Sequence, residues 1–392
     1  MIKKLLALSF LLSIFYSYSQ TAQLSAYAEV SIITSGPGDH LYEKFGHTAV
    51  RIKDPMLGID LLYNYGIFDF NGPDFYMNFV RGFMKYKLQR YPFHYSLKSA
   101  NEDERWVKQQ VLNLTQEQKN AYFKFLEINA QPENASYFYD PFFDNCATRP
   151  KDILKDILKD KLSFDTSILK EQKSLRDLMN EKINPNTWGS FGINIALGSR
   201  LDQIATIEEY MYLPEYLYAI FEKSSTIKNE EKANLVRSNK TLLKFETKPS
   251  KADSFSPFLI FTLLFFIILF ISYNDIRKGK RSKILDFSIL FITGLIGLLI
   301  VFLWFFTNHS TAPNNFNFLW AFAPNLIIAF FVTKDEIKSW INKYLTILLV
   351  FLALMPLLHL FGIQKFTYPV YPLILLLIVR YIFIIKFQKN KA

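Results

Sequence analysis

The hexapeptide DNCATR, residues Asp144–Arg149, holds the only cysteine of this 392-residue chain. The pattern from Cys146 to Leu158 predicts a helix with Asn145 or Asp144 as its cap. A structural disulfide needs two cysteines, so a disulfide within this chain is excluded. The unpaired N–H groups and the dipole at a helix start stabilise a thiolate and can also donate to an oxyanion. The sequence therefore predicts a nucleophilic cysteine at the N-terminus of a helix.

A histidine suited to activate this thiol lies well upstream, at the end of the heptapeptide LYEKFGH. It is His47, which starts a strand predicted over His47–Ile52. An imidazole beside a thiol takes its proton and stabilises the thiolate. The other histidines of this half lie in a predicted turn (His40) and beyond an aromatic strand (His94). We therefore predict that His47 activates Cys146.

A third polar group usually orients the imidazole of such a pair. The strand predicted over Ile59–Tyr65 follows a turn and should pair with the strand of His47. Asn64 on that strand is placed to lie beside the ring. Asp60 lies on the same face, because side chains two residues apart share a face of a strand. Asn64 is our first choice, and Asp60 stays open as its competitor.

The remaining polar residues do not change this interpretation. Arg51 shares the strand face of His47 and Arg149 lies one helical turn after Cys146, and we interpret both as structural. The histidines and the cysteine show no metal-ligand spacing, and no phosphate loop or dinucleotide fingerprint occurs, so we predict no metal and no cofactor. The net charge of +10 is spread through the chain without a nucleic-acid-binding motif, so we expect no nucleic-acid partner.

Periodicity and turn signals predict an α+β domain around these residues. Thr115 and Gln118 form a capping box for a helix that runs to about Ala130. The other predicted elements are strands over Tyr27–Ile33 and Lys85–Tyr91, and helices over Phe75–Phe83, Asn101–Leu112, 170–185 and 207–225.

The C-terminal part of the chain has the composition of a membrane domain. Leu, Ile and Phe dominate residues 257–385, in five stretches close to the length of a helical membrane span. Pro324 and Asn325 in the third stretch indicate a kink or a polar contact within the bundle. We interpret Arg380, in the last stretch, as snorkelling to the cytoplasmic surface. The predicted spans are Pro257–Tyr273, Ile284–Phe306, Phe316–Val332, Tyr344–Gly362 and Tyr368–Ile385.

Charges in the connections between spans predict the orientation. The first and third connections and the C-terminal tail are rich in Lys and Arg, whereas the second, Thr307–Asn315, has neither. The positive-inside rule then places the C-terminus in the cytoplasm and residues 20–250 outside it. Residues 1–19 have the pattern of a secretion signal, with the same consequence. We divide the chain into a signal peptide (1–19), an extracytoplasmic catalytic domain (20–243), a linker (244–256) and a five-helix membrane domain (257–392).

Five separated motifs carry a family resemblance. They are Ile33–Gly38, Leu41–His47, Tyr63–Phe70, Phe79–Gly82 and Asp144–Arg149. In these motifs the chain resembles the Lnb N-terminal periplasmic domain family. The resemblance implies a lipoprotein N-acyltransferase of the inner membrane, with its catalytic domain in the periplasm.

The same resemblance implies a circularly permuted papain-like fold. Such folds are similar to NlpC-type cysteine peptidases and lecithin:retinol acyltransferase-like enzymes, in which a histidine on a strand precedes a cysteine at a helix start. His47 and Cys146 match that order. The third member follows on the next strand, where Asn64 or Asp60 stands.

These observations lead to a ranked set of functions. We expect the Cys146 thiolate to attack a phospholipid ester while His47 protonates the leaving alcohol. The α-amine of a diacylglyceryl-cysteine lipoprotein would then take the acyl group from the thioester. Both substrates are anchored in a bilayer, which fits a tethered site. The alternatives are a membrane-tethered cysteine peptidase or amidase acting on the cell wall, and a non-catalytic lipid- or envelope-binding module.

Overall fold

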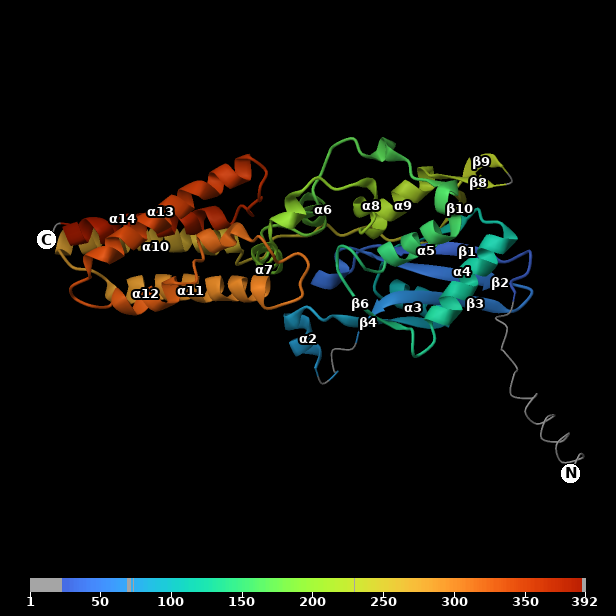
Figure 1. Cartoon of the computed structure of the whole chain (residues 1–392), viewed down its shortest axis with the longest axis horizontal. Helices are drawn as coiled ribbons and strands as arrows, with labels where there is room; N and C mark the ends of the chain where they lie inside the picture. Colours follow the sequence, from blue (N-terminus) through green and yellow to red (C-terminus); the bar gives the residue numbers. More distant parts are fainter. Residues whose placement is uncertain (1–22, 69–71, 73, 229, 390–392) are drawn as a thin grey trace, which may run out of the picture.

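The chain forms two parts that follow each other along its long axis, a domain built on a β-sheet and a bundle of helices (Figure 1). The computed structural model describes residues 23–68, 72, 74–228 and 230–389. The predicted signal peptide lies outside the described residues. Residues 244–256 are described throughout and join the two parts without a helix or strand.

A seven-stranded antiparallel sheet organises the first part, in the order β10-β5-β1-β2-β3-β4-β6. Both faces of β1 are covered, since Val30 and Ile32 lie in the main core and Ile33 packs in a smaller core with Phe93. Ser31 and Thr34 are buried as well, so all but the end residues of this strand are enclosed. The strands are β1 (Glu29–Ser35), β2 (His47–Asp54), β3 (Ile59–Ile67), β4 (Lys85–Pro92), β5 (Val107–Leu112), β6 (Ser136–Phe138) and β10 (Val236–Leu243).

Helices cover this sheet. The capping box of Thr115 and Gln118 is confirmed and starts α4. The helix predicted over 170–185 is the shorter α6, and the one predicted over 207–225 is the pair α8 and α9. The helices are α2 (Phe75–Arg81), α3 (Phe93–Glu102), α4 (Gln116–Asn129), α5 (Thr148–Leu158), α6 (Leu175–Lys182), α7 (Trp188–Ala196), α8 (Ile207–Tyr210) and α9 (Pro214–Lys223); a small second sheet holds β7 (Leu162–Ser163), β8 (Ser225–Lys228) and β9 (Glu231–Asn234).

The predicted helix over Asn101–Leu112 is wrong. Its first residues end α3, and Val107–Leu112 form β5, which lies between β10 and β1 in the sheet. Val107 and Val111 are buried there by neighbours on both sides. Acidic residues early in this segment and a lysine later are typical of a helix. Strand pairing with distant segments decided the local structure instead.

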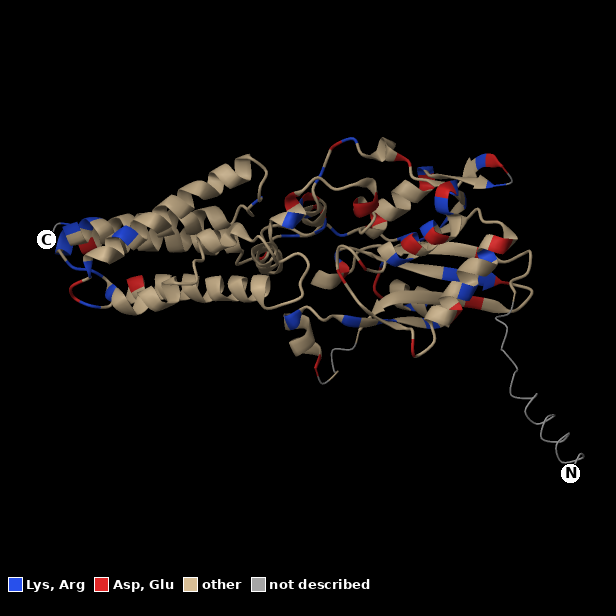
Figure 2. Cartoon of the chain, viewed as in Figure 1, with Lys and Arg blue, Asp and Glu red and all other residues tan. Residues whose placement is uncertain are grey.

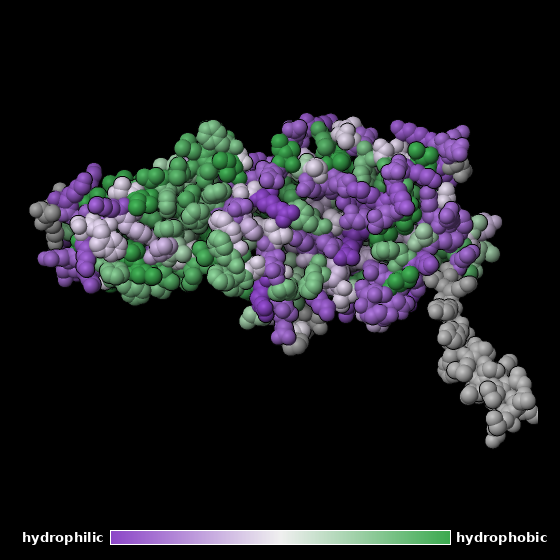
Figure 3. All heavy atoms as spheres, viewed as in Figure 1, coloured by the Kyte–Doolittle hydropathy of each residue, from purple (hydrophilic) through white to green (hydrophobic). Residues whose placement is uncertain are grey.

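Four long helices of the second part can span a membrane by length and composition. Figure 3 shows the apolar surface that they present. In Figure 2, Lys and Arg gather at the end of the bundle away from the sheet, as the positive-inside rule predicts for the cytoplasmic side. These helices are α10 (Pro257–Lys278), α11 (Lys283–Phe305), α13 (Ser339–Leu360) and α14 (Val370–Lys389).

The predicted third span, Phe316–Val332, is not a continuous helix. It consists of a 3-10 helix, η5 (Phe316–Leu319), and the short α12 (Asn325–Phe331). Pro324 lacks a backbone N–H and favours a break here. The Asn325 side chain bonds to Thr293 of α11 and Tyr344 of α13, so the predicted polar contact within the bundle is confirmed.

Arg380 does not snorkel, contrary to the prediction. Its side chain is fully buried, and it donates to Asp286 at 2.5 Å and to Asp275 at 3.0 Å. Asp286 also accepts a hydrogen bond from Arg281 at 2.9 Å. The acids of α10 and α11 thus compensate the buried guanidinium, and the sequence pattern alone did not show that they face α14.

The connection after α11 fastens the bundle to the sheet domain. The backbone N–H of Gly198 donates to the carbonyl of Thr311, and that of Ser199 to the carbonyl of Asn314. Between α13 and α14, Lys365 forms an ion pair with Asp177 at 2.6 Å. The end of the sheet domain that carries these contacts therefore faces the membrane.

Candidate active site

Cys146 lies in the turn that leads into α5. The side-chain oxygen of Asn145 accepts hydrogen bonds from the N–H groups of Ala147 and Thr148, at 2.8 and 3.0 Å. Its amide nitrogen donates to the carbonyl of Tyr212 at 2.9 Å. Asn145 therefore caps the turn that precedes α5, whereas the N-cap position of the helix itself is Ala147, two residues later than predicted. The two N–H groups that Asn145 occupies are not available to an oxyanion, which corrects the expectation that the helix start as a whole would supply donors.

The structure brings His47 and Asn64 beside this cysteine. His47 is the first residue of β2, and Asn64 lies near the end of the neighbouring β3. The Nε2 of His47 and the Oδ1 of Asn64 are 2.6 Å apart. Asn64 also donates from its Nδ2 to the hydroxyl of Tyr91 at 2.8 Å, which fixes the orientation of its amide. Nε2 of the imidazole is thus the proton-bearing nitrogen, and Nδ1 is left for the thiol proton.

The thiol and the imidazole lie close enough to interact, and each shifts the other's pKa. Burial alone would raise the pKa of Cys146, but the charge and hydrogen bond of His47 and the N–H groups of Thr48 and Cys146 lower it below its ordinary value. Burial alone would lower the pKa of His47, but Cys146 and Asn64 raise it. Both directions favour a thiolate–imidazolium pair, which is the nucleophilic form of cysteine.

Asp60 is occupied elsewhere. Its two carboxylate oxygens accept hydrogen bonds from the guanidinium of Arg51, each at 2.7 Å. Its Cα partner on β2 is Lys53, at the opposite end of that strand from His47. Of the two candidates for the third position, only Asn64 contacts the imidazole.

Arg149 also has a partner of its own. It forms a two-point ion pair with Asp144, with 2.6 Å between Nη2 and Oδ2. Its guanidinium lies 4.1 Å from the ring centre of Tyr137. The ion pair joins Asp144 and Arg149, the first and last residues of the motif around Cys146, which agrees with a structural role for Arg149.

Gly66, Tyr137 and Tyr139 lie beside Cys146, and the sequence analysis assigned Gly66 no role. Gly66 has φ +92° at an irregularity between β3 and β4. A Cβ atom there would lie 3.9 Å from the Cβ of Cys146 and 3.4 Å from the ring of Tyr139. The positive φ and the close approach both favour glycine. Its place in the YNYGIF segment, two residues after Asn64, was the available signal.

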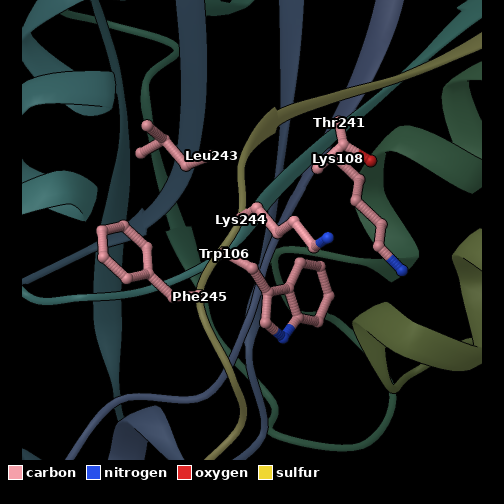
Figure 4. Close-up of a pocket in the computed structure, with 6 residues that line it drawn as sticks. All are labelled: Trp106, Lys108, Thr241, Leu243, Lys244 and Phe245. Atoms are coloured by element: carbon pink, nitrogen blue, oxygen red, sulfur yellow. The ribbon is translucent and has the colours of Figure 1, made fainter.

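An open hollow of about 350 Å³ lies between β5 and β10 (Figure 4). Neither Cys146 nor His47 nor Asn64 lines it. Its walls are Trp106, Lys108, Thr241, Leu243, Lys244 and Phe245. We therefore assign it no part in the chemistry. Within the described residues, no group of three or more His, Cys, Asp or Glu side chains could hold a metal ion.

Comparison with known families gives two matches. Residues 15–181 match a family model described as the Lnb N-terminal periplasmic domain. Residues 249–392 match a model described as the Lnb transmembrane domain, whose name counts five transmembrane helices. The four long helices and the broken η5–α12 segment lie within that match. No curated protein and no solved structure matched the chain.

Proposed function

Because this chain belongs to the Lnb family, with its periplasmic and transmembrane domains both present, we propose that it is a lipoprotein N-acyltransferase of the inner membrane. The observation that carries the proposal is the placement of Cys146 against His47, which is hydrogen-bonded to Asn64, inside a membrane-anchored periplasmic domain. We further propose that this domain is a circularly permuted papain-like fold, since the histidine strand precedes the cysteine-bearing turn and α5.

In the first half-reaction the Cys146 thiolate attacks the carbonyl carbon of a phospholipid ester. The tetrahedral intermediate expels the alcohol oxygen of the lysophospholipid, which takes a proton from the His47 imidazolium. The products are a Cys146 thioester and a lysophospholipid. Asn64 holds the imidazole through Nε2 and stabilises its charged form. We assign the developing oxyanion to the N–H groups of Thr48 and Cys146, which also lower the pKa of the thiol.

In the second half-reaction an amine takes the acyl group. The α-amine of a diacylglyceryl-cysteine lipoprotein attacks the thioester carbonyl, and His47 removes the proton that the nitrogen loses. The sulfur leaves as the thiolate, so the enzyme returns to its starting form. Cys146 is only 8% exposed, which limits competing attack by water. Water exclusion favours transfer over hydrolysis.

The test is mass spectrometry of a reporter lipoprotein from cells that carry the wild-type chain, Cys146→Ser or no copy. We expect N-acylated reporter with the wild type only, while Cys146→Ser accumulates in the membrane fraction at the wild-type level. N-acylation that persists in the variant would overturn the proposal. Cleavage of cell-wall fragments by the wild type, without acylation of the reporter, would favour the amidase instead.

A further inference from the structure

Helix α2 presents an unusual amount of apolar side chain to its surroundings. None of its seven residues, all of them described, is buried. Four large apolar side chains of this helix are exposed, and Met77 is exposed to 61%. A water-facing helix would not normally carry such a patch, which is typical of a surface that contacts a membrane or a partner. The four are Tyr76, Met77, Phe79 and Val80.

The fold places α2 at the depth of the membrane surface. The N–H of Asn308, just after α11, donates to the carbonyl of Arg81 at 2.9 Å. Gly82, with φ +78°, follows α2 directly. A Cβ atom on Gly82 would lie only 2.6 Å from the backbone nitrogen of His309, the residue after Asn308. Exposed Phe305 and Phe306 stand at the end of α11. Trp304 precedes them in the last turn of α11, and tryptophan at the end of a spanning helix is typical of the membrane–water interface.

A continuous row of aromatic rings leads from α2 to the candidate nucleophile. Phe79 contacts Phe75 at 6.4 Å between ring centres, and Phe75 contacts Phe68 at 5.9 Å. Phe68 contacts Tyr86 at 4.9 Å, and Tyr86 stacks on Tyr139 at 4.6 Å. Tyr139 is the ring that stands beside Gly66 and Cys146.

We propose that α2 lies in the outer leaflet of the membrane that the bundle spans, and that the aromatic row is the entry route for a phospholipid acyl chain. The apolar face of an interfacial helix sinks to the boundary between headgroups and acyl chains. Arg81, an exposed residue at the end of α2, suits a lipid phosphate at that depth. The route part of the proposal rests on the proposed function, and the position of α2 does not.

The position of α2 is tested with a single label. Cys146 is the only cysteine, so Cys146→Ser combined with Met77→Cys leaves one site for an environment-sensitive fluorophore. The matched control combines Cys146→Ser with Met56→Cys. Met56 is exposed to 67% in the turn between β2 and β3, beyond the end of β2 opposite His47. The full-length protein is reconstituted in vesicles that contain nitroxide-labelled phosphatidylcholine.

We expect blue-shifted emission at position 77 that the lipid nitroxide quenches, and water-like, unquenched emission at position 56. Equal emission and quenching at both positions would overturn the proposal. Blue-shifted emission at 77 without quenching would mean that a protein covers α2, and would overturn it too. Because both labelled proteins carry serine in place of Cys146, the result does not depend on whether the chain is an acyltransferase.

The route is tested with charged substitutions in the full-length protein. Met77→Asp and Phe79→Asp should each reduce acyl transfer from bilayer phospholipid by roughly tenfold, chiefly through KM, because a carboxylate resists burial in the interface. Met56→Asp should leave transfer unchanged. Alkylation of Cys146 by iodoacetamide should proceed at the wild-type rate in all three variants. Unchanged transfer in both α2 variants would refute the route, whereas transfer absent from the wild type would refute the proposed function.

Discussion

Replacing Asn64 by alanine separates the two candidates that the sequence left open. The variant removes the Oδ1 atom that lies 2.6 Å from Nε2 of His47, while Cys146 and the strand pairing remain. Asn64 is 8% exposed, so water has little access to the vacated position. The imidazole then loses the contact that sets its orientation and stabilises its charged form.

The expected loss follows from the type of bond. A hydrogen bond to a charged group contributes about 1.5–3 kcal/mol. With tenfold in rate for each 1.36 kcal/mol, kcat for acyl transfer should fall by about 10- to 150-fold. KM for phospholipid should change little, because Asn64 contacts the imidazole and not the proposed lipid route.

The assay is transfer to a lipoprotein peptide in proteoliposomes, with the rate of Cys146 alkylation measured across pH in parallel. The Asn64→Ala variant should be alkylated more slowly at neutral pH, because the pKa of Cys146 rises when the imidazolium is less stable. Asn64→Asp restores an acceptor for Nε2 and should recover part of both rates. Asp60→Asn keeps the site intact and should retain wild-type kcat. An Asp60→Asn defect as large as that of Asn64→Ala would refute the assignment, as would a fully active Asn64→Ala protein.

Two further outcomes follow from the buried charged groups. The pKa of Cys146 is lowered and that of His47 is raised, so both shifts favour the thiolate–imidazolium pair. The alkylation rate should fall as pH drops through the Cys146 pKa, and His47→Ala should move that fall to higher pH. Iodoacetamide labelling across pH measures both. In the membrane half, Arg380→Met should lower the free energy of unfolding by about 3 kcal/mol, because Asp275 and Asp286 lose their buried partner. Thermal unfolding in detergent measures this loss. The rate of Cys146 alkylation at 25 °C is the control and should not change.

Local signals were sufficient for the parts of the fold in which one segment decides its own structure. Alternation of apolar residues located β2 and β3, and the capping pair of Thr115 and Gln118 located α4. The single cysteine and the histidine at the start of β2 could be recognised because the chain offers few thiols and imidazoles. The structure brings Cys146 and His47 together as predicted, and their chemical roles stay a proposal.

Contacts between distant segments decided what local signals could not. Asn64 and Asp60 share a strand face, and only the position of the Arg51 side chain shows that Asp60 is already paired. The sequence of β5 predicted a helix, because its strand conformation depends on pairing with β1 and β10, which come from distant parts of the chain. Arg380 looked like a snorkelling residue because its acidic partners lie on other helices.

The membrane half contributes to the site itself, beyond anchoring it. The hydroxyl of Ser310, in the connection after α11, donates to the carboxylate of Asp140. The other oxygen of that carboxylate accepts from the N–H groups of Phe142 and Phe143 at 2.9 and 3.0 Å, and so shapes the turn that ends at Cys146. The connection after α11 is therefore hydrogen-bonded to the segment that precedes Cys146. The same connection also contacts the end of α2, so one segment of the membrane half touches both the proposed lipid entrance and the turn that leads to the thiol.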